Sequence, residues 1–213
     1  MDSVREMSPQ TYKTAGWIAI ISGILMWLLN VFMLLNRSIS ALLSFKYELL
    51  SIVQIILIIY ALWRFRSLLN VNFQFHNADG LINGLIFLHA AMIVLQLARD
   101  VLFRYLMPDV ADWGQLLQQI LSNPLSIILI GMDLLVEIAA SIVWIVFALR
   151  ILRLQDDLRG MLRPFAITTI VANALCLTIV LVPFGELLLS VCFIMLGIIF
   201  LRMANPPAQV DFV

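Results

Sequence analysis

Charge is scarce in this sequence. Asp, Glu, Lys and Arg make up only 12% of the 213 residues, whereas apolar residues make up 63%, and the mean hydropathy is +1.04. A soluble domain needs a largely polar exterior, which this composition does not supply. The sequence therefore argues against an ordinary soluble protein. It predicts an integral membrane protein, whose exterior faces hydrocarbon.

Several chemical signatures are also missing. The 13 basic and 13 acidic residues cancel, so no global field favours nucleic acid or an acidic substrate. The two cysteines, Cys176 and Cys192, fall inside apolar runs without a CxxC spacing. Of the two histidines only His89 is deep in an apolar run, which argues against a haem held by two facing histidines. No HExxH, GxSxG, P-loop or GxGxxG pattern is present. We therefore expect no nucleic-acid partner, no cofactor, no metal and no enzymatic activity.

Six apolar segments approach or exceed the roughly 20 residues that a transmembrane helix needs. They are residues 14–35, 41–63, 81–101, 124–149, 165–182 and 186–201. Only Pro183, Phe184 and Gly185 separate the last two, and proline with glycine favours a tight hairpin over one long helix. The connections between segments are short. The sequence thus predicts one all-α, multi-pass membrane domain of six transmembrane helices spanning residues 1–213.

Basic residues predict the orientation, because Lys and Arg accumulate on the cytosolic side of a membrane. With the N-terminus inside, nine of them fall on inner segments and four on outer segments. The inner residues are Arg5, Lys13, Arg64, Arg66, Arg150, Arg153, Arg159, Arg163 and Arg202; the outer ones are Arg37, Lys46, Arg99 and Arg104. We expect both termini in the cytosol and a plasma or inner membrane as the location.

Three of the predicted spans end in a similar way. Residues 60–66, 147–153 and 199–202 each combine an aromatic residue with arginine. One interpretation is that the chain contains three copies of a helical hairpin. The other is that helices running towards the cytosol commonly end with these residue types.

Pairs of small residues predict where helices approach each other closely. Gly16 with Gly23, and Gly80 with Gly84, are spaced so that each pair shares one helix face. Small residues let helix backbones meet in a membrane. We therefore expect both pairs to lie at helix–helix contacts.

A short amphipathic helix is predicted at residues 112–122. Asp112 and Gln115 have the spacing of a capping box. The apolar side chains that share one face of this helix are Trp113, Leu116, Leu117, Ile120 and Leu121. We expect the helix to lie flat in the outer membrane interface. It is either a passive connector, a docking surface for a partner or a lid over a cavity.

Polar and ionisable side chains recur near the middle of four predicted spans. They are Gln54, His89, Asp133, Glu137 and Asn173. Asp133 and Glu137 are four residues apart and share a helix face. A carboxylate at the bilayer centre costs roughly 2.5–3.5 kcal/mol, so both are expected to face the protein interior.

This polar layer predicts a site for protons or for a cationic ligand. Two carboxylates about 6 Å apart repel each other, so at least one is expected to hold a proton, or both need a cation. His89 is the natural partner, and we expect it to contact Glu137. The alternative is that these residues only join helices by hydrogen bonds, which is the favoured interpretation for Gln54 and Asn173.

Two functions fit these observations. The favoured one is a non-catalytic subunit or scaffold of a membrane complex, because the chain has short loops and no catalytic motif. Its partners are then the lipid bilayer and other membrane proteins or further copies of itself. The alternative is a small proton-coupled transporter or permease that uses the His/Glu/Asp cluster, since transporter sites lie near the midplane. An intramembrane enzyme is the third and least favoured option.

Overall fold

The computed structural model describes residues 8–35, 45–106, 113–154, 160–178 and 180–205. Within these ranges the chain is helical and contains no strand. The elements are α1 (Pro9–Leu35), α3 (Phe45–Phe73), the short 3₁₀ helix η1 (His76–Ala78), α4 (Asp79–Leu106), α5 (Trp113–Ser122), α6 (Pro124–Ile151), α7 (Leu162–Cys176) and α8 (Val182–Ala204).

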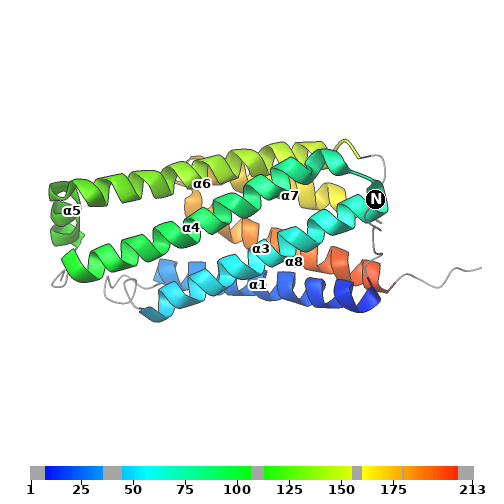
Figure 1. Cartoon of the computed structure of the whole chain (residues 1–213), viewed down its shortest axis with the longest axis horizontal. Coiled ribbons are helices and arrows are strands. Elements are labelled where there is room, and N and C mark those ends of the chain that lie inside the picture. Colours follow the sequence, from blue (N-terminus) through cyan, green and yellow to red (C-terminus); the bar gives the residue numbers. More distant parts are fainter. Residues whose placement is uncertain (1–7, 36–44, 107–112, 155–159, 179, 206–213) are drawn as a thin grey trace, which may run out of the picture.

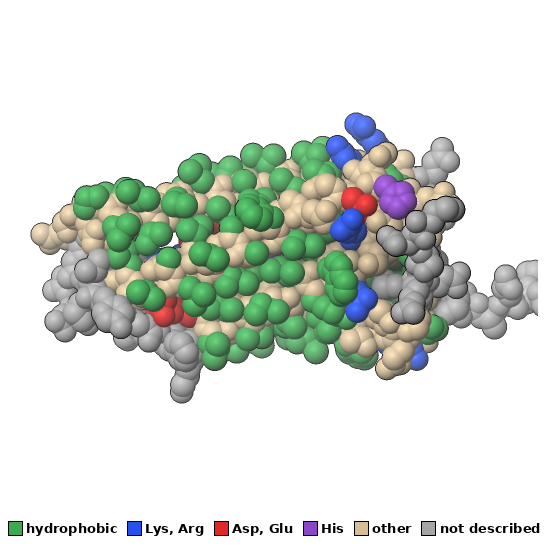
Figure 2. All heavy atoms as spheres, in the orientation of Figure 1, with side chains coloured by type: hydrophobic (Ala, Val, Ile, Leu, Met, Phe, Trp, Pro, Cys, Tyr) green, Lys and Arg blue, Asp and Glu red, His purple; other side chains and the backbone are tan. Residues whose placement is uncertain are grey.

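Five of these helices are long and apolar enough to cross a membrane, namely α1, α3, α4, α6 and α8. On the face drawn in Figure 2, apolar side chains cover most of the length of the bundle, and Lys and Arg side chains gather at one end. An apolar belt bordered by charge is the surface that a bilayer requires. The prediction of an all-helical membrane protein is confirmed at this level.

The helix predicted as the fifth span is shorter than expected. α7 has 15 residues, which corresponds to about 22 Å at 1.5 Å per residue, against a hydrocarbon core of about 30 Å. α8 begins at Val182, with Pro183 in its first turn, where a missing N–H costs nothing. The predicted position of the hairpin at residues 183–185 was therefore wrong, because α7 ends at Cys176 and residues 183–185 already belong to α8.

The helices pack side by side in one elongated bundle (Figure 1). α1 packs against α8 and α3, α4 against α3 and α6, and α7 against α6 and α8. The end where α1 begins and α8 ends is called the terminus end, and the opposite end, crossed by α5, is called the α5 end. Figure 1 shows α4 and α6 running past the α7–α8 turn to the α5 end.

Four buried phenylalanines fill the bundle in its terminus half. Phe65 of α3 meets the other three rings edge-on, at centroid distances of 5.9 Å to Phe147, 5.6 Å to Phe165 and 6.2 Å to Phe200. All four are at most 1% exposed. We call them the aromatic cluster. Phe65, Phe147 and Phe200 belong to the three similar span ends, so their similarity has a packing reason whether or not the hairpins are repeats.

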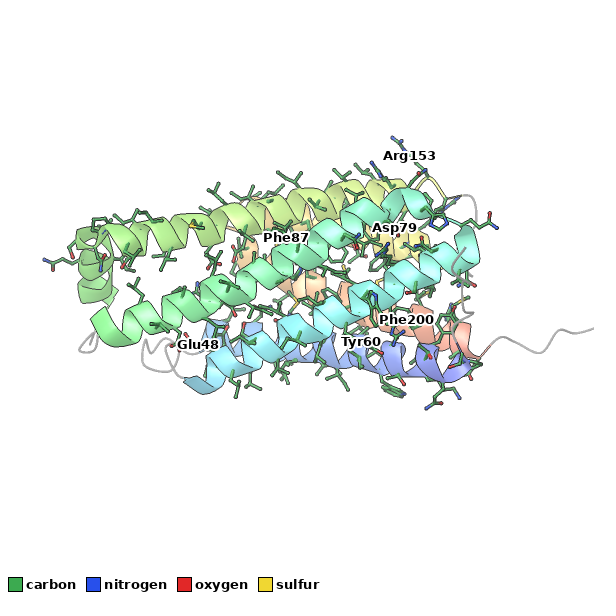
Figure 3. All side chains as sticks on the ribbon, viewed as in Figure 1. Glu48, Tyr60, Asp79, Phe87, Arg153 and Phe200 are labelled. Carbon is green, nitrogen blue, oxygen red and sulfur yellow. The ribbon has the colours of Figure 1, made fainter. Side chains whose placement is uncertain are left out.

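Polar contacts tie α3 to α4 at the terminus end. Arg66 donates from Nε to Asp79 Oδ1 at 2.8 Å and from Nη1 to Asn83 Oδ1 at 3.1 Å. Asn70 donates from Nδ2 to the same Asp79 oxygen at 2.8 Å. Asp79 is the first residue of α4, where the helix dipole favours a carboxylate (Figure 3). These contacts and the aromatic cluster hold this end of the bundle together.

The two predicted glycine pairs behave differently. A Cβ added at Gly16 would lie 2.9 Å from the carbonyl oxygen of Gly197, and one added at Gly23 would lie 2.6 Å from that of Ser190. This pair therefore does lie at the contact between α1 and α8. A Cβ at Gly80 or Gly84 would meet no atom within 4 Å, so the expected contact at that pair was wrong.

Candidate functional site

A cavity of about 580 Å³ lies between six helices, on the α5 side of the aromatic cluster. Its lining side chains come from α1, α3, α4, α6, α7 and α8. Trp144 bounds it towards the terminus end, because its ring contacts both His89 at 6.5 Å and Phe147 of the aromatic cluster at 5.8 Å between centroids. In the other direction the lining reaches Leu34, near the end of α1, and Tyr47, near the start of α3. The cavity therefore extends from mid-bundle towards the α5 end.

The structure brings together most of the predicted midplane residues. Gln54, His89, Glu137 and Asn173 all line this cavity. The fifth, Asp133, accepts a hydrogen bond from the lining residue Arg99, with 2.6 Å between Oδ2 and Nη1. These five side chains were selected because each lies near the middle of its predicted span. They come from four helices and lie in or beside one cavity.

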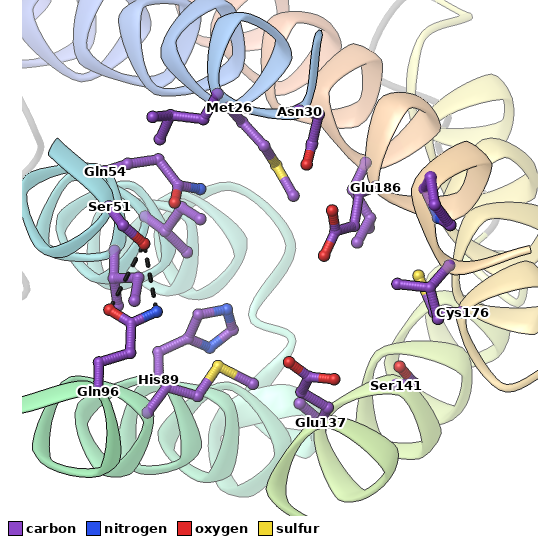
Figure 4. A pocket seen from close by; sticks show the side chains of 18 of the residues that line it. Met26, Asn30, Ser51, Gln54, His89, Gln96, Glu137, Ser141, Cys176 and Glu186 are labelled. Carbon is purple, nitrogen blue, oxygen red and sulfur yellow. Dashed lines mark hydrogen bonds between the residues drawn. The ribbon is translucent and has the colours of Figure 1, made fainter. Parts of the chain in front are cut away.

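His89 and Glu137 both face the cavity (Figure 4). His89 is buried, and its Nδ1 lies 2.7 Å from the backbone oxygen of Leu85. A carbonyl oxygen only accepts, so Nδ1 carries the proton and Nε2 of the neutral ring is an acceptor. The hydrogen bonds of the described side chains do not join His89 to Glu137. A direct contact between the two stays a prediction.

Glu186 is the functional candidate that the sequence reasoning missed. It lies in the second turn of α8, lines the cavity, and points towards the space that Glu137 also faces (Figure 4). Because residues 183–185 were interpreted as a turn, Glu186 was placed at a membrane surface. Gly185 is instead a packing residue: a Cβ there would lie 2.8 Å from the carbonyl oxygen of Ala172 on α7.

Two buried amides point into the cavity without a hydrogen-bond partner among the described residues. Asn30 is 9% exposed and Gln54 is 7% exposed, and both line the cavity (Figure 4). Buried amide groups are normally hydrogen-bonded. A ligand or water in the cavity is the available partner.

Of the midplane residues, Asp133 makes a polar contact between helices, whereas the expected contact of Asn173 is not found among the described residues. Asn173 donates to the Thr169 oxygen of its own helix at 2.8 Å, so it does not join two helices as predicted. The cross-helix contacts near the cavity are Arg99–Asp133, between α4 and α6, and Gln96–Ser51, between α4 and α3. In the latter, Gln96 Nε2 donates to Ser51 Oγ at 3.2 Å.

Acidic side chains outnumber basic ones in the lining of the cavity. Glu48, Glu137 and Glu186 contribute carboxylates, whereas Arg99 is the basic residue among the described lining side chains and is paired with Asp133. Glu137 is also within electrostatic range of Glu186. The described residues contain no group of three His, Cys, Asp or Glu side chains that is placed to hold a metal ion. The arrangement favours protons or an organic cation over an anion.

The predicted amphipathic segment contains a helix, α5, over Trp113–Ser122. Asp112 and the side chains of Trp113, Leu116 and Leu117 lie outside the described part of the structure. Of the remaining apolar positions, Ile120 is partly buried and Leu121 is 71% exposed. α6 follows directly: Asn123 caps it by accepting from the Leu125 N–H at 3.0 Å. α5 therefore crosses the bundle end as a helix separate from α6.

The chain matches no protein-family model, no curated protein and no solved structure. Its function is therefore argued from the chemistry of the cavity.

Proposed function

We propose that this chain is a small proton-coupled membrane transporter whose solute site is the cavity between the six helices. The observation that carries the proposal is that Glu137 of α6 and Glu186 of α8 face the same cavity at mid-bundle. Transporter sites typically lie near the bilayer midplane between helices. From the sequence, the subunit or scaffold function was favoured and the proton-coupled transporter was the alternative. The position of the two carboxyl groups is our reason for proposing the transporter.

The two carboxylates supply the coupling. Charged carboxylates inside a membrane are costly and repel each other, so each needs a proton or a cation. Arg99 already binds Asp133 at 2.6 Å, which leaves Glu137 and Glu186 to protons or to solute. A site that must be neutral in every state exchanges a proton for a cationic solute. This exchange is the basis of coupled transport.

The cavity is also closed in one direction. Trp144 and the aromatic cluster separate it from the terminus end, whereas its lining reaches the ends of α1 and α3. We propose that α7 crosses the membrane as a short sixth span, that both termini are cytosolic, and that α5 lies flat in the outer interface. The cavity then faces the outer side, with the aromatic cluster as its inner closure.

Proton flux into proteoliposomes tests this function. Vesicles containing the purified chain and a trapped pH dye receive organic cations, organic acids and sugars in turn. We expect one solute class to drive proton movement, and Glu137→Gln to reduce that flux at least roughly tenfold because it removes the exchanging carboxylate. Asp100→Asn is the matched control, because Asp100 does not line the cavity. Flux that is absent for every class, or equal in both variants, contradicts the proposal.

The subunit function stays a second candidate because of α5. Leu121 is 71% exposed on α5, the helix that crosses the bundle end, and a companion that packs on α5 would cover it. If this function holds, the chain purifies in mild detergent with a companion at fixed stoichiometry, and Leu121→Gln releases it. If the chain purifies as a homogeneous species without a companion, the result contradicts the subunit function and is consistent with the transporter function.

A further inference from the structure

We infer that the cavity binds a primary or secondary organic ammonium ion, which enters in exchange for a proton from the Glu137–Glu186 pair. The inference rests on the proposed function in that the same cavity is taken as the solute site. It goes further by naming the chemical class of the solute and the groups that select it.

The charges around the pair select a cation. The titratable or charged side chains that surround it are Tyr47, Glu48, His89, Arg99, Asp133 and Cys176, from α3, α4, α6 and α7. The described lining residues of α1 carry no charge. Arg99 and Asp133 neutralise each other, so the remaining balance is acidic. An anion is disfavoured here, and a neutral solute supplies no charge to replace a proton that the pair releases.

The neutral groups of the lining select a cation that has N–H bonds. Asn30 and Gln54 are more than nine-tenths buried, have no partner among the described residues and direct their amides into the cavity. His89 offers Nε2 as a further acceptor, because its Nδ1 is bonded to the Leu85 oxygen. A primary or secondary ammonium donates at least two hydrogen bonds and satisfies such acceptors. A quaternary ammonium donates none and prefers a cage of aromatic rings.

The size and walls of the cavity select an organic body. A volume of about 580 Å³ is in the usual range for small organic ligands and far exceeds a bare metal ion. Apolar walls are formed by Met26, Ile58, Met92, Trp144 and Leu189. Methionine side chains adapt to irregular shapes. The ligand is therefore an amine with an apolar portion that packs towards Trp144.

The exchange step balances in charge. Before binding, each carboxyl group of the pair holds a proton. The ammonium enters with its own proton, one carboxyl group releases its proton to water, and the resulting carboxylate pairs with the ammonium while the other carboxyl group stays protonated. No bond within the amine forms or breaks, and the net charge of the occupied cavity is unchanged.

Calorimetry on the purified full chain in detergent tests the inference, with phenethylammonium as the probe. Titration in two buffers of different ionisation enthalpy measures the protons released. We expect about one proton per ligand, and at least roughly tenfold weaker binding of phenethyl alcohol and of phenethyltrimethylammonium. Glu137→Gln and Glu186→Gln are expected to weaken phenethylammonium binding by a similar factor. Asp100→Asn is expected to leave it unchanged, and thermal melting checks that each variant is folded.

Gln54→Leu is a second test if a glutamate variant does not fold. It removes an acceptor but no charge, so it weakens phenethylammonium and leaves phenethyltrimethylammonium unaffected. Equal binding of these two cations, binding without proton release, or no binding overturns the inference. Solute-driven proton flux without amine binding supports the transporter function and contradicts the inference that the solute is an amine. Amine binding with proton release but without flux supports the inferred amine site and contradicts the transporter function.

Discussion

Phe65→Ala is expected to lower the free energy of unfolding by roughly 2–4 kcal/mol. Phe65 is fully buried and its ring meets Phe147, Phe165 and Phe200, one on each of α6, α7 and α8. Truncation leaves a cavity at the point where four helices meet, and the surrounding rings lose their dispersion contacts. The expected range of losses extends lower than that for soluble cores because lipid is as apolar as the protein interior.

Reversible unfolding in mixed micelles, compared with that of Phe87→Ala, measures this effect. Phe87 is 73% exposed on α4, so its truncation removes the same atoms without opening an internal cavity (Figure 3). We expect the control to change stability by less than about 0.5 kcal/mol. Similar losses in the two variants contradict the packing described for the aromatic cluster.

The helices were largely predictable because the bilayer imposes a simple rule. Five apolar runs of sufficient length became α1, α3, α4, α6 and α8. The boundary between α7 and α8 was not predictable from the same rule. Pro183 and Gly185 commonly mark turns, but proline is also tolerated in a first helical turn and glycine also permits close packing. Only the contact of Gly185 with α7 shows which of these applies.

The gathering of the candidate residues at one cavity could be predicted from the sequence, but their contacts could not. All spans are expected to share one membrane, so position along each span predicts depth, and Gln54, His89 and Glu137, which have similar predicted depths, line the same cavity. Sequence does not give the rotation of a helix against its neighbours. The pairing of Asp133 with Arg99, 34 residues away, and the inward direction of Glu186 therefore appeared only in three dimensions.

Gly197→Leu is expected to destabilise the fold by roughly 3 kcal/mol or more, the upper part of the range for overpacking. A Cβ at Gly197 would lie 2.6 Å from the backbone oxygen of Gly16 and 2.5 Å from Ile20 Cγ1. The Ile20 side chain has room to rotate, but the Gly16 oxygen belongs to the backbone of α1 and does not. The leucine therefore separates α1 from α8.

Gly84→Leu is the matched control, and its expected sign is opposite. A Cβ at Gly84 meets no atom within 4 Å, and leucine is a better helix former than glycine by up to about 1 kcal/mol. Thermal and denaturant unfolding in detergent compare the two variants. If Gly197→Leu does not fold, Gly197→Ala is expected to show a smaller loss of the same sign. Equal shifts at positions 84 and 197 contradict the close contact of α1 with α8.

Substitution of Gly197 is also expected to affect ligand binding in the cavity. α1 contributes Met26 and Asn30 to the lining, and it is held in place by the glycine contacts with α8, which itself carries Glu186. Separating these two helices moves the Asn30 amide away from the Glu186 carboxyl group. Folded Gly197→Ala is therefore expected to bind phenethylammonium more weakly than Gly84→Leu does. Equal affinities mean that the ligand is held by α3, α4 and α6 without α1, which removes Asn30 from the site.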